Sequence, residues 1–169
     1  MDVMFKKCTA LALMLFMLLT GCSAGNASGS GGLKDSATLQ EIVDKIDTEI
    51  GIQMPSELDE QTLQDLFGVK KEDVEEFYGK FAMVMNSSDN VIAIKAKDGK
   101  AEDVKAALEK RKEDVIQSFE QYLPDQYEKA QKGLVITKGN YVFLVIVGEA
   151  EQIDQDMNKA KEIVDSYFS

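Results

Sequence analysis

The chain has 169 residues, of which 19 are basic and 30 acidic, and its formal net charge at pH 7 is −11. It contains no histidine, and its two cysteines, Cys8 and Cys22, both stand near the N-terminus. The rest of the chain therefore lacks the side chains for Ser-His or Cys-His catalysis, imidazole or thiolate zinc sites and His- or Cys-ligated haem. We expect no metal and no cofactor, and the negative charge argues against a nucleic-acid partner.

The N-terminus has the pattern of an export signal. Lys6 and Lys7 precede an apolar run of about a dozen residues, 8–19, which is shorter than the roughly 20 residues that a membrane-spanning helix needs. A basic start, a short apolar run and then small residues follow one another as in secretory signal peptides. Residues 1–21 are therefore predicted to be a signal peptide.

The apolar run ends in "LTGC", residues 19–22, which resembles the lipobox of bacterial lipoproteins. The resemblance implies cleavage between Gly21 and Cys22 and a diacylglyceryl lipid on Cys22, and two acyl chains suffice for stable membrane anchoring. The protein is then expected at the extracytoplasmic face of the bacterial cell membrane. An ordinary signal peptide with an incidental cysteine is the alternative.

The segment after Cys22 predicts a linker. Residues 22–36 are mostly Ser, Gly, Ala and Asn, and such a composition buries too little apolar surface to offset its conformational entropy. We predict a flexible tether over 22–36 and a single α+β domain over 37–169.

The predicted domain begins with helices. Thr38 and Glu41 have the spacing of a capping box, and apolar residues recur at helical spacing from there to Gly51. A shorter helix is predicted over 59–67, and the acid-rich segment 70–79, "KKEDVEEFYG", is expected to add another turn or two. The carboxylates of this segment are interpreted as a solvated face.

Two hairpins and two amphipathic helices follow. The strands "FAMVMN" (81–86) and "NVIAIKAK" (90–97) flank a polar turn, and a long helix is predicted over 101–122, interrupted by Pro124 and continued to about residue 131. In the second hairpin, 133–148, Gly139 and Asn140 suit a primed two-residue turn, and "YVFLVIV" is typical of a central strand covered on both faces. Apolar spacing predicts a last helix within 151–168.

The predicted fold is α+β: N-terminal helices, then a roughly four-stranded antiparallel sheet from two hairpins, with helices packed on it. The order of "VIAIKAKDG", "VKAALEKRKEDVIQSFEQYLPDQ" and "KGNYVFLVI" over residues 39–148 is similar to a family of small lipoproteins of Gram-positive, Firmicutes-type bacteria, which is known as a domain of unknown function. The resemblance implies neither an activity nor functional residues.

Arg111 is the first candidate site residue. It lies three residues after Leu108 and four before Val115, which places its guanidinium on the helix stripe that should face the sheet. A charge at such a position is paired with a carboxylate, reaches toward solvent at the edge of the stripe, or binds an anionic ligand.

Tyr122 and Gln126 are the other candidates, in "QYLPDQY" at the predicted helix break. A helix break exposes backbone groups and is a reasonable place for a binding surface. A tyrosine that packs its ring and hydrogen-bonds its hydroxyl to the loop explains the same residues.

Our functional hypothesis is a non-catalytic binding or interaction module of the cell envelope, not an enzyme, with an envelope protein or peptide as its partner. The alternative is an envelope hydrolase that uses carboxylates or a Ser-Lys pair, which needs no histidine. A single-lobed solute-binding component of a transporter is a third hypothesis.

Overall fold

The computed structural model describes residues 32–169, so the predicted signal peptide, Gly21 and Cys22 lie outside the described residues. The described chain forms one antiparallel sheet in the order β1-β2-β3-β5-β4 with helices around it. The strands are β1 (Pro55–Glu57), β2 (Val74–Ala82), β3 (Asn90–Ala96), β4 (Leu134–Lys138) and β5 (Tyr141–Ile146). The helices are α1 (Leu39–Glu49), α2 (Glu60–Asp65), the short 3₁₀ helix η1 (Lys71–Asp73), α3 (Ala101–Phe119), α4 (Pro124–Lys132) and α5 (Ile153–Ser166). The predicted α+β class is confirmed.

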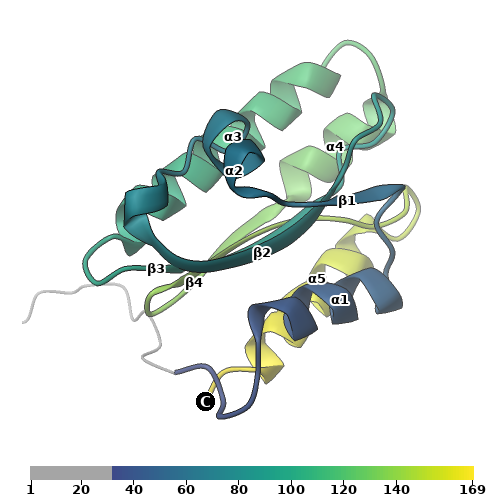
Figure 1. Cartoon of the computed structure of the whole chain (residues 1–169). Helices are drawn as coiled ribbons and strands as arrows, with labels where there is room; N and C mark the ends of the chain where they lie inside the picture. Colours follow the sequence, from purple (N-terminus) through teal and green to yellow (C-terminus); the bar gives the residue numbers. More distant parts are fainter. Residues whose placement is uncertain (1–31) are drawn as a thin grey trace, which may run out of the picture.

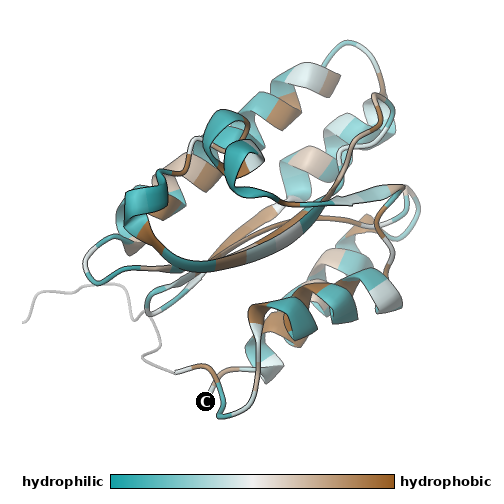
Figure 2. Cartoon of the chain, in the orientation of Figure 1, coloured by the Kyte–Doolittle hydropathy of each residue, from teal (hydrophilic) through white to brown (hydrophobic). Residues whose placement is uncertain are grey.

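The sheet is the middle of three layers. Helices α2, α3 and α4 lie on one face of the sheet, and α1 and α5 lie on the other (Figure 1). The inner strands β3 and β5 are apolar along most of their length (Figure 2), and they are buried on both faces except at Lys95 and Tyr141. Strands covered on both faces lose the apolar-polar alternation of a half-exposed sheet, as the sequence of β5 predicts.

The first helix is held at its start and along its length. Thr38 Oγ1 accepts the backbone N–H of Glu41 at 3.1 Å and Glu41 Oε2 accepts that of Thr38 at 2.9 Å, so the predicted capping box is present. Lys80 on β2 lies 2.7 Å from Asp47 and 2.9 Å from Asp44 on this helix, and its hydrogen bond to Asp47 raises the pKa of its amine. These contacts fix α1 on the sheet.

The first hairpin differs from its prediction at both ends of β2. The segment predicted to be helical is a strand from Val74 onward, because a bulge between Val74 and Glu76 breaks the two-residue alternation. This bulge puts Val74 and Phe77 at a spacing that resembles a helix. The strand also ends earlier than predicted, at Ala82, so residues 83–89 form a long loop.

The sheet has five strands rather than four because β1 adds an edge strand. Its residues pair with the end of β2, with Ser56 opposite Phe81. A three-residue strand that starts with proline gives no periodic signal, and proline is tolerated at an edge because its missing N–H is not needed there.

The folded part also begins earlier than residue 37. Leu33 pairs with Phe168 in an isolated bridge, and Lys34 donates its backbone N–H to Tyr167 O at 3.0 Å. Residues 33–36, which composition alone assigns to the tether, therefore belong to the domain. Leu33 is the apolar residue that packs there, against the core.

A substitution at Gly133 tests how closely the end of α4 approaches the sheet. A Cβ at this position would lie 2.7 Å from Cγ1 of Ile146 and 3.1 Å from the backbone oxygen of Ala130. We expect Gly133→Ala to lower the free energy of unfolding by about 1–3 kcal/mol, as overpacking does, measured by urea denaturation. Gly32→Ala is the control because a Cβ there has no atom within 4 Å. Equal stability of the two variants would contradict the close approach.

Candidate functional site

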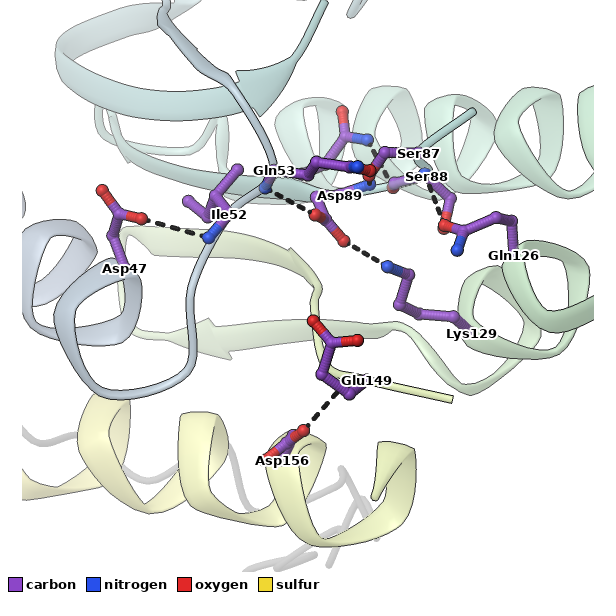
Figure 3. Close-up of polar contacts among 11 residues, drawn as sticks. Asp47, Ile52, Gln53, Ser87, Ser88, Asp89, Gln126, Lys129, Glu149 and Asp156 are labelled. Carbon is purple, nitrogen blue, oxygen red and sulfur yellow. Dashed lines mark hydrogen bonds and ion pairs between the residues drawn. The ribbon is translucent and has the colours of Figure 1, made fainter. Parts of the chain in front are cut away.

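A cluster of loops at one end of the sheet brings together most of the polar candidates. Its centre is the β2–β3 loop, residues 83–89, which contacts the segment after α1 and helix α4 (Figure 3). Ser87, Ser88, Asp89 and Asn90 are each less than 7% exposed although all four are polar. Buried polar side chains need partners. Ser88 and Asp89 have theirs on other elements, whereas Ser87 and Asn90 bond within the segment itself.

Asp89 and Lys129 form a buried ion pair at this centre. Lys129 Nζ on α4 lies 2.5 Å from Asp89 Oδ1, and each side chain is only 6% exposed. The other carboxylate oxygen of Asp89 accepts the backbone N–H of Gln53 at 2.8 Å (Figure 3). Both charges are thus compensated, and the pair ties α4, the β2–β3 loop and the segment after α1 to one another.

Gln126, a sequence-predicted candidate, holds the same loop. Its Oε1 accepts the backbone N–H of Ser88 at 2.9 Å and the Ser88 hydroxyl at 3.1 Å (Figure 3). It lies on α4, one turn before Lys129. Gln126 therefore positions the loop through its side-chain oxygen.

Next to this loop is a cavity of about 430 Å³, which we call the Arg111 cavity. Arg111 and Asn90 line it together with serine hydroxyls and an apolar wall, and no Asp or Glu is among its lining residues. The lining residues are Ala82, Val84, Met85, Ser87, Ser88, Asn90, Arg111, Val115, Ser118, Phe119 and Tyr122. The charge that faces the cavity is therefore positive, in a chain whose net charge is −11.

Arg111 is half-buried in this lining and forms no ion pair with a carboxylate of the described residues. Its neighbours Leu108 and Val115 are buried, as the helix stripe predicts, but Arg111 takes part in none of the ion pairs among residues 32–169. Its Nε is buried and has no hydrogen-bond partner in that range. The guanidinium carbon lies 5.1 Å from the ring centroid of Phe67, a cation–π contact.

Burial also changes the proton affinity of Arg111. It lowers the pKa of the guanidinium from its usual value, and the negative charge of Asp114 acts in the opposite direction. The cause is the loss of hydration around a charge that has too few partners. Of the alternatives that the sequence left open, pairing with a carboxylate is absent from the described residues.

Asn90 carries a second unpartnered group in the same cavity lining. The residue is 3% exposed, and its Nδ2 donates to Ser88 O at 2.9 Å. Its Oδ1 is buried without a hydrogen-bond partner among residues 32–169. Asn90 and Arg111 thus both belong to the cavity lining, and each has one buried polar atom without a hydrogen-bond partner among residues 32–169.

Tyr122 and Met85 belong to the exposed part of the lining. Tyr122 is 65% exposed and Met85 is 89% exposed, although both line the cavity. The packed position expected for the Tyr122 ring is therefore not adopted. Arg111 and Tyr122 line the same cavity, whereas Gln126 is not among its lining residues and contacts Ser88 of the loop.

A second cavity of about 450 Å³, the Asp89 cavity, is lined by two other residues of the β2–β3 loop, Asn86 and Asp89. It is lined mainly by polar residues, which include Asp89, Lys129, Asp125 and Glu149. Asp89 and Lys129 neutralise each other, and Glu149 donates its backbone N–H to Asp156 at 3.1 Å (Figure 3). Within residues 32–169 no three His, Cys, Asp or Glu side chains are grouped to hold a metal ion.

The serines nearest to Lys129 are not arranged as nucleophiles. Lys129 donates to Asp89, the Ser88 hydroxyl donates to Gln126, and the Ser87 hydroxyl accepts the backbone N–H of Asp89 at 3.3 Å. A Ser-Lys site needs a lysine amine that removes the serine proton. Here the carboxylate of Asp89 is the partner of the amine.

The fold and its loop cluster define an α+β domain with two adjacent cavities at one end of its sheet. The chain belongs to the family described as Domain of unknown function (DUF4358), whose model matches residues 48–147. No curated protein and no solved structure matches the chain. No helix among residues 32–169 is long and apolar enough to span a membrane.

Family membership confirms the predicted relation to a domain of unknown function, and the lipobox and the Gram-positive origin stay predictions. The match spans the β2–β3 loop, α3 and α4, so it includes all residues of the Arg111 cavity. Sequence reasoning missed Asp89, Asn90 and Lys129. The sequence signal that could have indicated them is the polar run "SSDN", which stands directly before an apolar strand.

Breaking the ion pair should destabilise the domain. Lys129→Met leaves the Asp89 carboxylate buried without its cation, and we expect the free energy of unfolding to fall by about 3–5 kcal/mol. The measurement is urea denaturation at neutral pH. The control is Lys71→Met, which breaks an exposed ion pair with Glu60. The Lys71 side chain is 64% exposed and that of Glu60 is 49% exposed, so the free energy of unfolding should fall by less than about 1 kcal/mol. Similar losses in the two variants would contradict the structural role of the buried pair.

Proposed function

We propose that the protein is a lipid-anchored binding module of the bacterial cell envelope, without catalytic activity of its own. A diacylglyceryl lipid on Cys22 holds it at the extracytoplasmic face of the cell membrane. The support for the anchor is the export-signal pattern of residues 1–21 and the lipobox-like "LTGC". The negative chain would be repelled by anionic lipid headgroups, so the lipid itself supplies the membrane contact.

The binding function rests on the unpaired state of Arg111. A half-buried cation with an unsatisfied Nε is costly to maintain, because the cation–π contact with Phe67 replaces only part of the hydration that it loses. The chain has many carboxylates, yet none of them lines this cavity. An anionic ligand that enters the cavity supplies the negative charge that the lining lacks.

Binding is favoured over hydrolysis because the reactive side chains have other partners. The chain lacks histidine, and the lysine nearest to the buried serines is bound to Asp89. A hydrolase also needs a positioned group that takes up a proton. The Arg111 cavity has none in its lining, because arginine stays protonated.

The anchor has a direct test. We expect Cys22→Ser to abolish incorporation of labelled fatty acid in intact cells, because the serine hydroxyl does not replace the thiol in the acylation reaction. Gel autoradiography of the labelled protein measures this. Cys8→Ser is the matched control, since Cys8 lies within the predicted signal peptide. Labelling that persists in the Cys22 variant would overturn the anchor.

The cavity is tested by crosslinking in cells. A photoreactive amino acid in place of Tyr122 should give a defined adduct, because Tyr122 is exposed and lines the cavity. The same group in place of Glu102, whose side chain is 82% exposed on α3, should not give this adduct.

Adding Arg111→Gln should remove the adduct while changing the free energy of unfolding by no more than about 1 kcal/mol, since the cation–π contact is the stabilising interaction that is lost. Lys105→Gln, which removes a surface charge from α3 outside the cavity lining, should leave the adduct intact. An adduct that is unaffected by Arg111→Gln would contradict the proposed binding site.

A further inference from the structure

Three methionines are exposed at one end of the sheet. Met54, Met83 and Met85 are between 69% and 89% exposed, whereas Met157, the fourth methionine among residues 32–169, is buried in the core. The three are also a majority of the five large apolar side chains that are exposed in this range. Side chains as exposed as these leave their thioether groups accessible from solvent.

Met54 and Met83 are neighbours across the ladder between β1 and β2. This ladder ends at the pair of Pro55 and Ala82. Met54 directly precedes the first member of the pair, and Met83 directly follows the second. Adjacent strands lie about 5 Å apart, so the two methionines stand next to each other where the ladder ends.

Met85 belongs to the same group. It follows Met83 by two residues, so their Cα atoms are at most about 7 Å apart. Gln53 and Asn86, the residues next to Met54 and Met85, line one cavity, and Figure 1 shows the start of β1 at the same end of the sheet as the β2–β3 loop. Because methionine is unbranched and has three rotatable bonds, the three side chains can meet over this end of the sheet.

The folding of the chain does not explain a methionine at position 54. The φ of Met54 is +44°, which lies in the left-handed region that glycine and asparagine favour. Its side chain is exposed and is not part of the core. The thioether group is therefore a better reason for this residue type than backbone conformation or packing.

Thioethers select the kind of ion that such a group of side chains binds. They are soft ligands and favour Cu(I), whereas Ca²⁺ and Mg²⁺ take oxygen ligands and Zn²⁺ takes imidazole, thiolate or carboxylate. The expectation of no metal in this chain rests on its lack of histidine and of cysteine in the domain, and it does not extend to thioethers. A net charge of −11 also attracts a cation.

We propose that Met54, Met83 and Met85 form a surface site for Cu(I), which their three thioether sulfurs coordinate. The site is distinct from the Arg111 cavity, because Met54 and Met83 are not among the residues that line this cavity. It takes up and releases the ion without a change of oxidation state. It also does not depend on the anionic ligand of the proposed binding function.

The test uses the full chain in lipid nanodiscs, with ¹³C in the methyl groups of its methionines, and NMR spectroscopy in chloride-free buffer. Ag(I) is the first probe because it is a soft monovalent ion that is stable in air. We expect one equivalent of Ag(I) to shift the methyl resonances of Met54, Met83 and Met85 together and to leave that of Met157 unchanged. Zn²⁺ and Ca²⁺ should shift none of the four.

Leucine variants show whether the three methionines act as one site. Met54→Leu, Met83→Leu and Met85→Leu nearly conserve side-chain volume at exposed positions, so the fold should be retained. Each should weaken the binding of Cu(I), kept reduced by ascorbate, at least about tenfold in competition with bicinchoninate, since changes around metal ligands already cost about 10–100-fold. Met157→Leu is the matched control and should leave the affinity unchanged.

The assignment would be overturned by the absence of methyl shifts at one equivalent of Ag(I), or by an affinity for Cu(I) that the three exposed leucine variants leave unchanged. Shifts that appear one after another over several equivalents would show separate weak contacts and refute a single site. Shifts confined to Met83 and Met85 would refute the part of Met54. None of these results bears on the crosslinking at Tyr122, so the proposed binding function is tested separately.

Discussion

The buried ion pair between Asp89 and Lys129 determines where the loops of the site lie. It joins the β2–β3 loop to α4, and the second oxygen of Asp89 joins both to the segment after α1. Two charges taken out of water gain little net stability when they meet, but each alone is strongly unfavourable. The pair therefore acts mainly on conformation, because any displacement of the loop that separates the two charges costs free energy. Both cavities share this loop as a wall.

The buried Lys129 and the half-buried Arg111 lie on the same side of the sheet and have opposite surroundings. Lys129 has a carboxylate at 2.5 Å, whereas the Nε of Arg111 has no partner among residues 32–169. Lysine and arginine also differ in what they offer, since lysine presents a compact charge and arginine a planar fork of donors. The compact charge serves the internal pair, and the fork lines the cavity. The loop that the first cation holds leads directly into Asn90, the first residue of β3, which lines the second cation's cavity.

The sequence predicts those parts of the fold whose signal is local and periodic. Local signals of this kind predict the capping box of α1, the apolar stripes of α3 and α5 and the second hairpin. Each signal lies within a short segment, so it can be recognised without the rest of the chain. The start of strand β2 resembles a helix because its bulge at Val74 removes the alternation. Asp89 and Lys129 are 40 residues apart, and a contact over that separation leaves no pattern in either segment.

The same distinction explains why Arg111 is a candidate from the sequence and Asn90 is not. A helix fixes the direction of every side chain relative to its apolar stripe, so a charge on that stripe is conspicuous from residue spacing alone. Asn90 stands at the start of strand β3, after a loop that has no such period, and "SSDN" is equally typical of an exposed turn. Burial of Asn90 arises only when Gln126, Lys129 and Gln53 close around its neighbours. Unsatisfied polar atoms are informative in this situation because the surrounding loop satisfies so many others. Arg111 Nε and Asn90 Oδ1 are two of the four buried side-chain atoms without a hydrogen-bond partner among residues 32–169, and both residues belong to the lining of one cavity.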